Sequence, residues 1–109
     1  MSNQMSESAK ACLAACKKCA TECDSCAKEM AGKESKSACP ACCIECAAIC
    51  RLCVDAITNN SHFLQQLSKL CADTCDWCAK ECLASGHDHC KSCAEACRLC
   101  AEACRKMVG

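Results

Sequence analysis

CKSCAEACRLCAEAC, residues 90–104, is the stretch of this chain that decides its fold. Its five cysteines recur at steps of three, four, three and four residues. Because each residue of an α-helix turns by about 100°, these steps keep all five thiols within a stripe about 60° wide. The stretch therefore predicts a helix that presents its cysteines on one face.

The same spacing occurs in three earlier segments, where cysteine again stands at the positions that Leu and Ile usually occupy. A further thiol, Cys42, lies beside Cys43 and outside the main stripe. The stripes consist of Cys12, Cys16, Cys19, Cys23 and Cys26; Cys39, Cys43, Cys46, Cys50 and Cys53; Cys71, Cys75, Cys78 and Cys82; and Cys90, Cys93, Cys97, Cys100 and Cys104. We expect helices at about residues 6–31, 37–58, 62–85 and 88–107.

The lengths of these segments and of their links predict the architecture. A chain of 109 residues is too short for two stable cores, so we expect one domain over residues 1–109. Helices joined by links of a few residues lie antiparallel to their neighbours. The sequence therefore predicts an all-α protein, an up-down-up-down antiparallel four-helix bundle with a cysteine-lined core.

Composition indicates that this core contains few large apolar side chains. Among the hydrophobic residues, 20 are Cys and 19 are Ala. Burial of apolar surface contributes about 25 cal/mol per Å², so such small side chains alone would stabilise the fold only weakly. We expect bound metal ions to fill the core.

The cysteines are predicted to be metal ligands and not disulfide partners. Helical neighbours four residues apart keep their Cβ atoms about 5–6 Å apart, whereas a disulfide needs about 3.5–4.5 Å. The start of the chain, MSNQMSESAKAC, contains no apolar signal segment. We therefore expect a cytoplasmic protein whose thiols stay reduced.

Charge and motif content argue against several classes of function. Lys and Arg together number 13, as do Asp and Glu, so no basic field attracts nucleic acid or anionic lipid. No apolar run approaches the length of a membrane span. No nucleophile stands beside an orienting partner, and no acid–base pair is recognisable. We expect no nucleic-acid partner, no membrane partner and no enzymatic activity.

The predicted topology sorts side chains between the two ends of the bundle. One end, here called the histidine end, gathers Met30, Cys39, Cys42, Cys82, His87, His89 and Cys90. The other, here called the apolar end, gathers Met5, Val54, Ile57, Phe63, Leu64, Leu67 and Met107. We expect metal to pass through the histidine end. One heptad position outside the thiol stripe is occupied by Phe63, Leu70 and Trp77. Side chains at this position can either pack on a neighbouring helix or form a contact between subunits.

Thiolates select Cu(I), Zn(II) or iron–sulfur clusters. Zinc and cluster sites usually take their cysteines from turns or loops that wrap the metal, whereas these cysteines are predicted on straight helices. Cu(I) accepts two or three thiolates, which CxxxC pairs or facing helices supply. The sequence predicts many Cu(I) ions per chain, from about 10 to about 20. A zinc or cadmium thiolate buffer of metallothionein-like role is the alternative.

These features resemble the bacterial copper storage proteins, specifically the cytosolic branch that lacks an export signal. The resemblance spans nearly the whole chain and rests on the four stripes, on repeated CxxxC and on His87-Asp88-His89-Cys90. It implies a four-helix bundle that binds many Cu(I) ions along its lumen. It also implies copper passage at the histidine end, and often a homotetramer. The predicted metal ligands are the 20 cysteines, including Cys42, together with His87 and His89.

Overall fold

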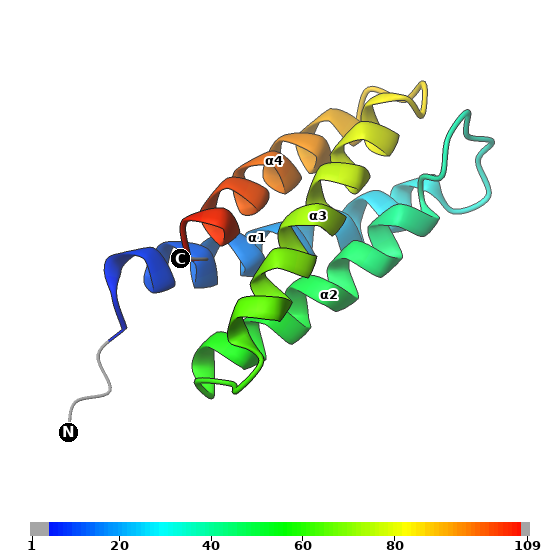
Figure 1. Ribbon diagram of the computed structural model, residues 1–109. Coiled ribbons are helices and arrows are strands. Elements are labelled where there is room, and N and C mark those ends of the chain that lie inside the picture. The colour runs from blue at the N-terminus through cyan, green and yellow to red at the C-terminus, as the bar shows by residue number, and fades with distance from the viewer. Residues whose placement is uncertain (1–4, 108–109) are drawn as a thin grey trace.

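The computed structural model describes residues 5–107 and shows four α-helices in that part of the chain (Figure 1). They are α1 (Glu7–Met30), α2 (Ala41–Thr58), α3 (Leu64–Leu83) and α4 (Cys90–Met107). Each helix packs beside the one that follows it, and α1 also packs beside α4. The described residues contain no strand. The predicted four-helix bundle is confirmed.

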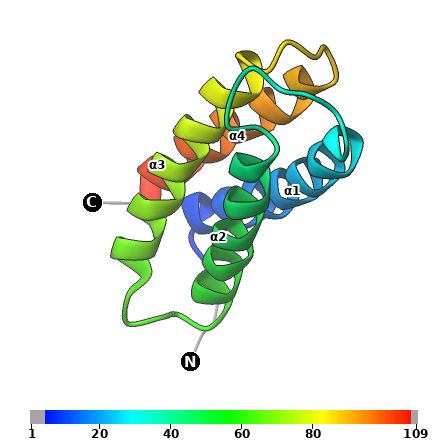
Figure 2. The ribbon, with the colours of Figure 1, turned by 90° about the vertical axis from the view of Figure 1, so that its right-hand side faces the viewer.

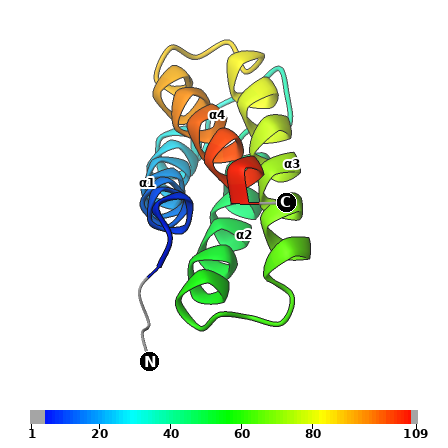
Figure 3. The same ribbon diagram turned by 60° about the vertical axis from the view of Figure 1, so that its left-hand side comes forward.

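The bundle is elongated, with principal extents of 51 × 20 × 19 Å. The α1–α2 and α3–α4 connections lie together at one end (Figures 1 and 2). The α2–α3 connection lies at the opposite end, where α1 begins and α4 ends (Figure 3). Neighbouring helices therefore run antiparallel, and residues 31–40 and 84–89 meet at the histidine end.

Helix α1 begins and ends where its sequence predicts. Ser6 is the N-cap, and its Oγ accepts a hydrogen bond from the backbone N–H of Ala9 at 3.1 Å. This bond satisfies one of the N–H groups that the first turn leaves free. Beyond the helix, Gly32 has a φ of 80°, in the left-handed region that glycine adopts without strain.

Helix α2 begins at Ala41, four residues after the predicted start at residue 37. Pro40 occupies the N-cap position without a side-chain cap, and a proline disfavours helical conformation in the residue before it. Ser37 does not cap this helix. Its Oγ instead donates to the backbone oxygen of Glu81 at 2.6 Å, which attaches the segment before α2 to the end of α3.

The remaining helices are slightly shorter than predicted. Helix α3 begins at Leu64 because the Oγ of Ser61 accepts the backbone N–H of Phe63 at 3.0 Å, in a turn that precedes the helix. It ends at Leu83, shortly before Gly86, whose φ is 88°. Helix α4 begins at Cys90, two residues after the predicted start. The differences lie in the connections and leave the cysteine-bearing parts of the helices as predicted.

Cysteine forms the interior of the bundle. All 20 cysteines are buried, and none exposes more than 4% of its surface. Small alanines such as Ala47 and Ala72, both fully buried, lie beside them in the core. Charged pairs lie outside the core, where Arg51 contacts Asp24 at 3.0 Å across α1 and α2. Among residues 5–107, no helix is both long enough and apolar enough to cross a membrane.

The apolar end differs most clearly from the prediction at Phe63. Ile57 is buried, and Met5, Val54, Leu64 and Met107 pack partly buried against the core. Phe63 instead exposes 56% of its surface and contacts the ring of His62 at a centroid distance of 5.0 Å. It precedes the first residue of α3, so the turn at Ser61 and not the helical stripe sets its direction.

Candidate metal site

The thiols of neighbouring helices meet along the axis of the bundle. Within single helices, CxxxC pairs such as Cys12/Cys16 and Cys46/Cys50 bring their Sγ atoms to 3.9 and 4.0 Å. Between helices the contacts range from 3.4 Å, from Cys43 to Cys82, to 4.0 Å, from Cys16 to Cys71. The heptad-like spacing predicted this convergence, since it places every stripe on the inner face.

These contacts form one continuous path, which we call the sulfur column. Sγ–Sγ contacts of 4.0 Å or less connect every cysteine except Cys53 into a single network, in which Cys42 is attached sideways to Cys78 and is not counted in the column. The Sγ of Cys53 joins at the apolar end, within 4.8 Å of those of Cys12, Cys16 and Cys104. The column therefore runs from the apolar end to Cys26 and Cys90 at the histidine end.

Many groups of four sulfurs along the column are close enough to share a metal ion. In Cys19/Cys46/Cys50/Cys75 and Cys23/Cys78/Cys93/Cys97, all four Sγ atoms lie within 4.8 Å of one another. Metal–thiolate bonds are about 2.3 Å long, so two sulfurs on one ion lie at most about 4.6 Å apart. The column can accept ions between its sulfurs with small side-chain rotations and no movement of the helices.

All 20 cysteines are free and buried thiols. Burial raises the pKa of Cys39 to about 11, and it raises the pKa of Cys26 as well, with a further contribution from the hydrogen bond to Cys90. A bare thiolate is costly in this low-dielectric interior. A bound cation removes that cost because it replaces the proton and neutralises the sulfur.

Three sulfurs end the column at the histidine end. Cys26 Sγ lies 3.4 Å from Cys90 Sγ and 3.8 Å from Cys39 Sγ, and Cys39 lies 3.8 Å from Cys90. They come from α1, from the residue before Pro40 and from the first residue of α4. This triangle matches the three-thiolate coordination that Cu(I) accepts. Met30, only 1% exposed, packs in the same core cluster.

The two predicted histidine ligands lie beside each other in the α3–α4 connection. Their ring centroids are 5.5 Å apart. His87 Nε2–H donates to the backbone oxygen of Glu34 at 2.8 Å, so this nitrogen contacts a carbonyl oxygen and not a sulfur. His89 Nε2 is buried and has no hydrogen-bond partner among the described residues. Unlike Nε2 of His87, Nε2 of His89 is thus free of hydrogen bonds within residues 5–107.

Hydrogen bonds attach the two loops at this end to each other, which sequence analysis does not predict. Besides the bond from His87, the carboxylate of Glu81 accepts the backbone N–H of Ala38 at 2.8 Å, and Lys36 N–H donates to Ser85 O at 3.3 Å. Backbone groups make most of these bonds, and no residue pattern identifies them in advance. Together they close residues 31–40 against the ends of α3 and α4, over the end of the sulfur column.

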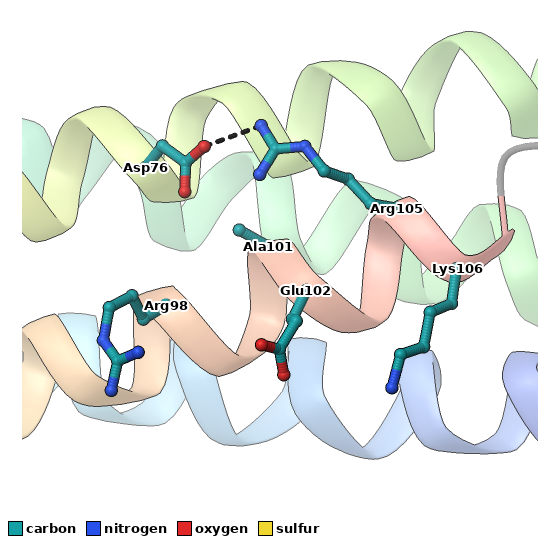
Figure 4. Close-up of a pocket in the computed structure, with 6 residues that line it drawn as sticks. All are labelled: Asp76, Arg98, Ala101, Glu102, Arg105 and Lys106. Atoms are coloured by element: carbon teal, nitrogen blue, oxygen red, sulfur yellow. Dashed lines mark ion pairs between the residues drawn. The ribbon is translucent and has the colours of Figure 1, made fainter.

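A hollow of about 410 Å³ on the outside of α3 and α4 is separate from this site (Figure 4). Arg105 spans it and contacts Asp76 at 2.6 Å. No cysteine or histidine lines it, so it offers no soft metal ligand. Its lining residues are Asp76, Arg98, Ala101, Glu102, Arg105 and Lys106.

Comparisons with known proteins agree with this geometry. The Cu(I)-bound copper storage protein BsCsp3 superposes with a TM-score of 0.87 and 39% identity, covering 94% of this chain and all of that one. The apo form of Csp3 from Bacillus subtilis gives 0.81 and 39%, covering 92% and 98%. Nmul_A1745 from Nitrosospira multiformis gives 0.82 and 33%, covering 93% and 94%.

Sequence comparison leads to the same group of proteins. An uncharacterized cysteine-rich protein of Bacillus subtilis, YhjQ, is 41% identical over 55 residues, a match that covers 50% of this chain and 51% of that protein. Residues 2–109 match the sequence profile of the family described as Csp, copper storage protein. With nearly the whole chain matched and the cysteine-lined bundle in place, this protein belongs to the copper storage protein family.

Proposed function

We propose that residues 1–109 form a single storage domain that holds many Cu(I) ions along the sulfur column and thereby buffers or detoxifies copper. The continuous network of Sγ contacts carries this proposal, because it supplies soft ligands along the axis without interruption. The ligands are the 20 cysteines, with His89 and His87 at the histidine end. The family and its Cu(I)-bound relative support the choice of metal.

Charge balance favours Cu(I) over the zinc or cadmium alternative. Each Cu(I) that replaces one thiol proton leaves the net charge unchanged, so a column filled with about one ion per cysteine stays near neutral. Tetrahedral Zn(II) uses four thiolates per ion, so 20 thiolates around five ions leave about ten uncompensated negative charges in the interior. Buried charge of that size is strongly unfavourable.

An anaerobic titration of the reduced protein tests the proposal. Cu(I) is added in the presence of a chromophoric Cu(I) chelator, and copper retained by the protein is counted against protein concentration. We expect more than ten ions per chain to be withheld from the chelator. A parallel titration uses Zn(II) followed by Cu(I). If Zn(II) fills the protein and Cu(I) does not displace it, copper storage is the wrong function.

A storage role requires no catalytic group, and we infer that the protein is not an enzyme. Its buried thiols lack the exposed, activated position that catalytic cysteines need. We place it in the cytoplasm, since 20 free thiols persist in a reducing compartment. Neither nucleic acid nor a membrane is an expected partner of a chain with formal net charge of zero.

We further infer that the protein forms a homotetramer, as the family resemblance implies. Leu70 and Trp77, seven residues apart on α3, expose 46% and 39% of their surface, so packing within the bundle does not account for these two large apolar side chains. Light scattering coupled to gel filtration measures the mass of the assembly. Leu70→Glu should lower that mass, whereas Gln66→Glu on the same helix should leave it unchanged. A monomeric parent protein would contradict the inference.

A further inference from the structure

Cys42 is the cysteine that the axial stripe does not explain. It precedes Cys43 by one residue, so it projects about 100° away from it around α2. Cys43 faces the interior, where its Sγ lies 3.7 Å from Cys93 Sγ on α4. Cys42 is nevertheless fully buried. Its thiol therefore lies between helices and not on the surface.

The contacts of Cys42 place it against α3. Its Sγ lies 3.6 Å from the Sγ of Cys78 and 4.0 Å from the backbone oxygen of the same residue. Contact with a backbone oxygen means that the sulfur lies alongside the α3 chain, to one side of the bundle axis. The S–H···O interaction is long and weak, so the loss of its proton costs little hydrogen bonding.

Cys78 joins this side position to the sulfur column. Its Sγ lies 3.9 Å from those of Cys43 and Cys82, and it belongs to the axial group with Cys23, Cys93 and Cys97. A thiolate can bridge two Cu(I) ions. Cys78 is therefore in position to bind one ion in the column and a second ion toward Cys42.

We propose that Cys42 and Cys78 hold a Cu(I) ion in the interface between α2 and α3, beside the axial column. This inference rests on the proposed copper function. It adds one binding site to the side of the column, between Cys42 and Cys78, which we call the branch. Cu(I) replaces the proton of the Cys42 thiol and shares the Cys78 thiolate with the column. One proton passes to solvent, copper stays in the +1 state, and no redox partner is needed.

Substitution of Cys42 tests the branch by copper counting. Cys42→Ser keeps the size of the side chain and removes the soft ligand, so the capacity should fall by about one ion per chain with the rest of the isotherm superimposed on the parent curve. Cys50→Ser is the matched control on the same helix. Its Sγ lies in the column, within 3.8 Å of Cys71 and Cys75, so this change should alter the isotherm over several ions.

Two results of this experiment overturn the inference. One is an unchanged capacity in Cys42→Ser, which makes Cys42 a packing residue. The other is a loss as broad as that of Cys50→Ser, which makes it part of the column. Circular dichroism of both variants establishes that the helices are intact.

Anomalous diffraction at the copper edge, from crystals of the loaded parent protein, tests the site without a substitution. We expect a peak between the Sγ atoms of Cys42 and Cys78. Copper peaks along the axis without one at this position refute the branch and leave storage intact. A parent protein that holds no copper refutes the proposed function itself.

Discussion

The Sγ atoms of Cys26 and Cys90 lie 3.4 Å apart, and with Cys39 they close the sulfur column at the histidine end. These residues come from three different segments, so the triangle exists only when both connections at this end are in place. A copper ion that enters here meets a three-thiolate site before it reaches the rest of the column. We therefore expect this end of the column to take part in copper transfer as well as in storage.

We expect Cys90→Ser to slow copper loading as well as to lower the capacity. The substitution removes one of three sulfurs at the point of transfer, so the first thiolate site is weakened. Cys104→Ser is the control, because Cys104 contacts Cys12 at 3.5 Å at the other end of the column. Cys104→Ser should lower the capacity by a similar amount, while copper still loads at the rate of the parent protein. Stopped-flow transfer of copper from a Cu(I)–chelator complex measures the loading rates of both variants. Equal slowing in the two variants would contradict entry of copper at the histidine end.

The helices should form without metal. Ala, Glu, Lys and Arg occupy most positions outside the cysteine stripes, and they favour helix independently of copper. Bound ions should then raise the melting temperature, since ligands that bind only the native state stabilise it through mass action. Circular dichroism of the reduced apoprotein and of the loaded protein measures both effects. A random-coil apoprotein that becomes helical only with copper would contradict the prediction.

The apoprotein should lose stability as the pH rises from about 9 toward 11. Burial raises the pKa of Cys39 from 9.0 to about 11, so in this interval the unfolded chain has released a proton that the folded chain still holds. Unfolding is then favoured by deprotonation, and stability falls with rising pH. Urea denaturation under reducing, anaerobic conditions measures this. The copper-loaded protein is the control, because its thiols have already lost their protons. Equal pH dependence of both forms would contradict the prediction.

The cysteine stripes allowed the helices and the interior to be predicted, because their spacing is a local property of the chain. Cys97, for example, needs only its neighbours three and four residues away to be assigned to an inner face. Ser37 shows where such reasoning ends. It is an ordinary capping residue by sequence, yet it bonds to Glu81, 44 residues away. A contact of that kind depends on the assembled bundle.

Phe63 and Cys42 show the same limit within single side chains. Helical periodicity predicts that Phe63 lies in the apolar end, but the helix begins one residue after it. The spacing predicts that Cys42 lies outside its stripe, but its partner, Cys78, is determined by how closely α2 and α3 pack. Periodicity predicts which face a residue occupies. It does not predict the neighbour that this face meets.

His87 and His89 should affect copper transfer in opposite directions. His87 Nε2–H donates to Glu34 O and helps to hold residues 31–40 over the column, so His87→Ala should speed removal of copper by a chelator. His89 Nε2 is buried without a partner among the described residues, which suits it to bind copper briefly during transfer. His89→Ala should therefore slow removal. Both variants should keep nearly the full capacity.

Ile57→Ala is the control at the apolar end for both histidine variants. Ile57 is 5% exposed, so its truncation should leave a cavity and lower the free energy of unfolding by about 2–4 kcal/mol. Copper should still leave at the parent rate, because the histidine end is unchanged. The rates are measured from the absorbance of the chelator complex on fully loaded protein. If both histidine variants release copper at the parent rate while Ile57→Ala releases it faster, copper passes through the apolar end instead.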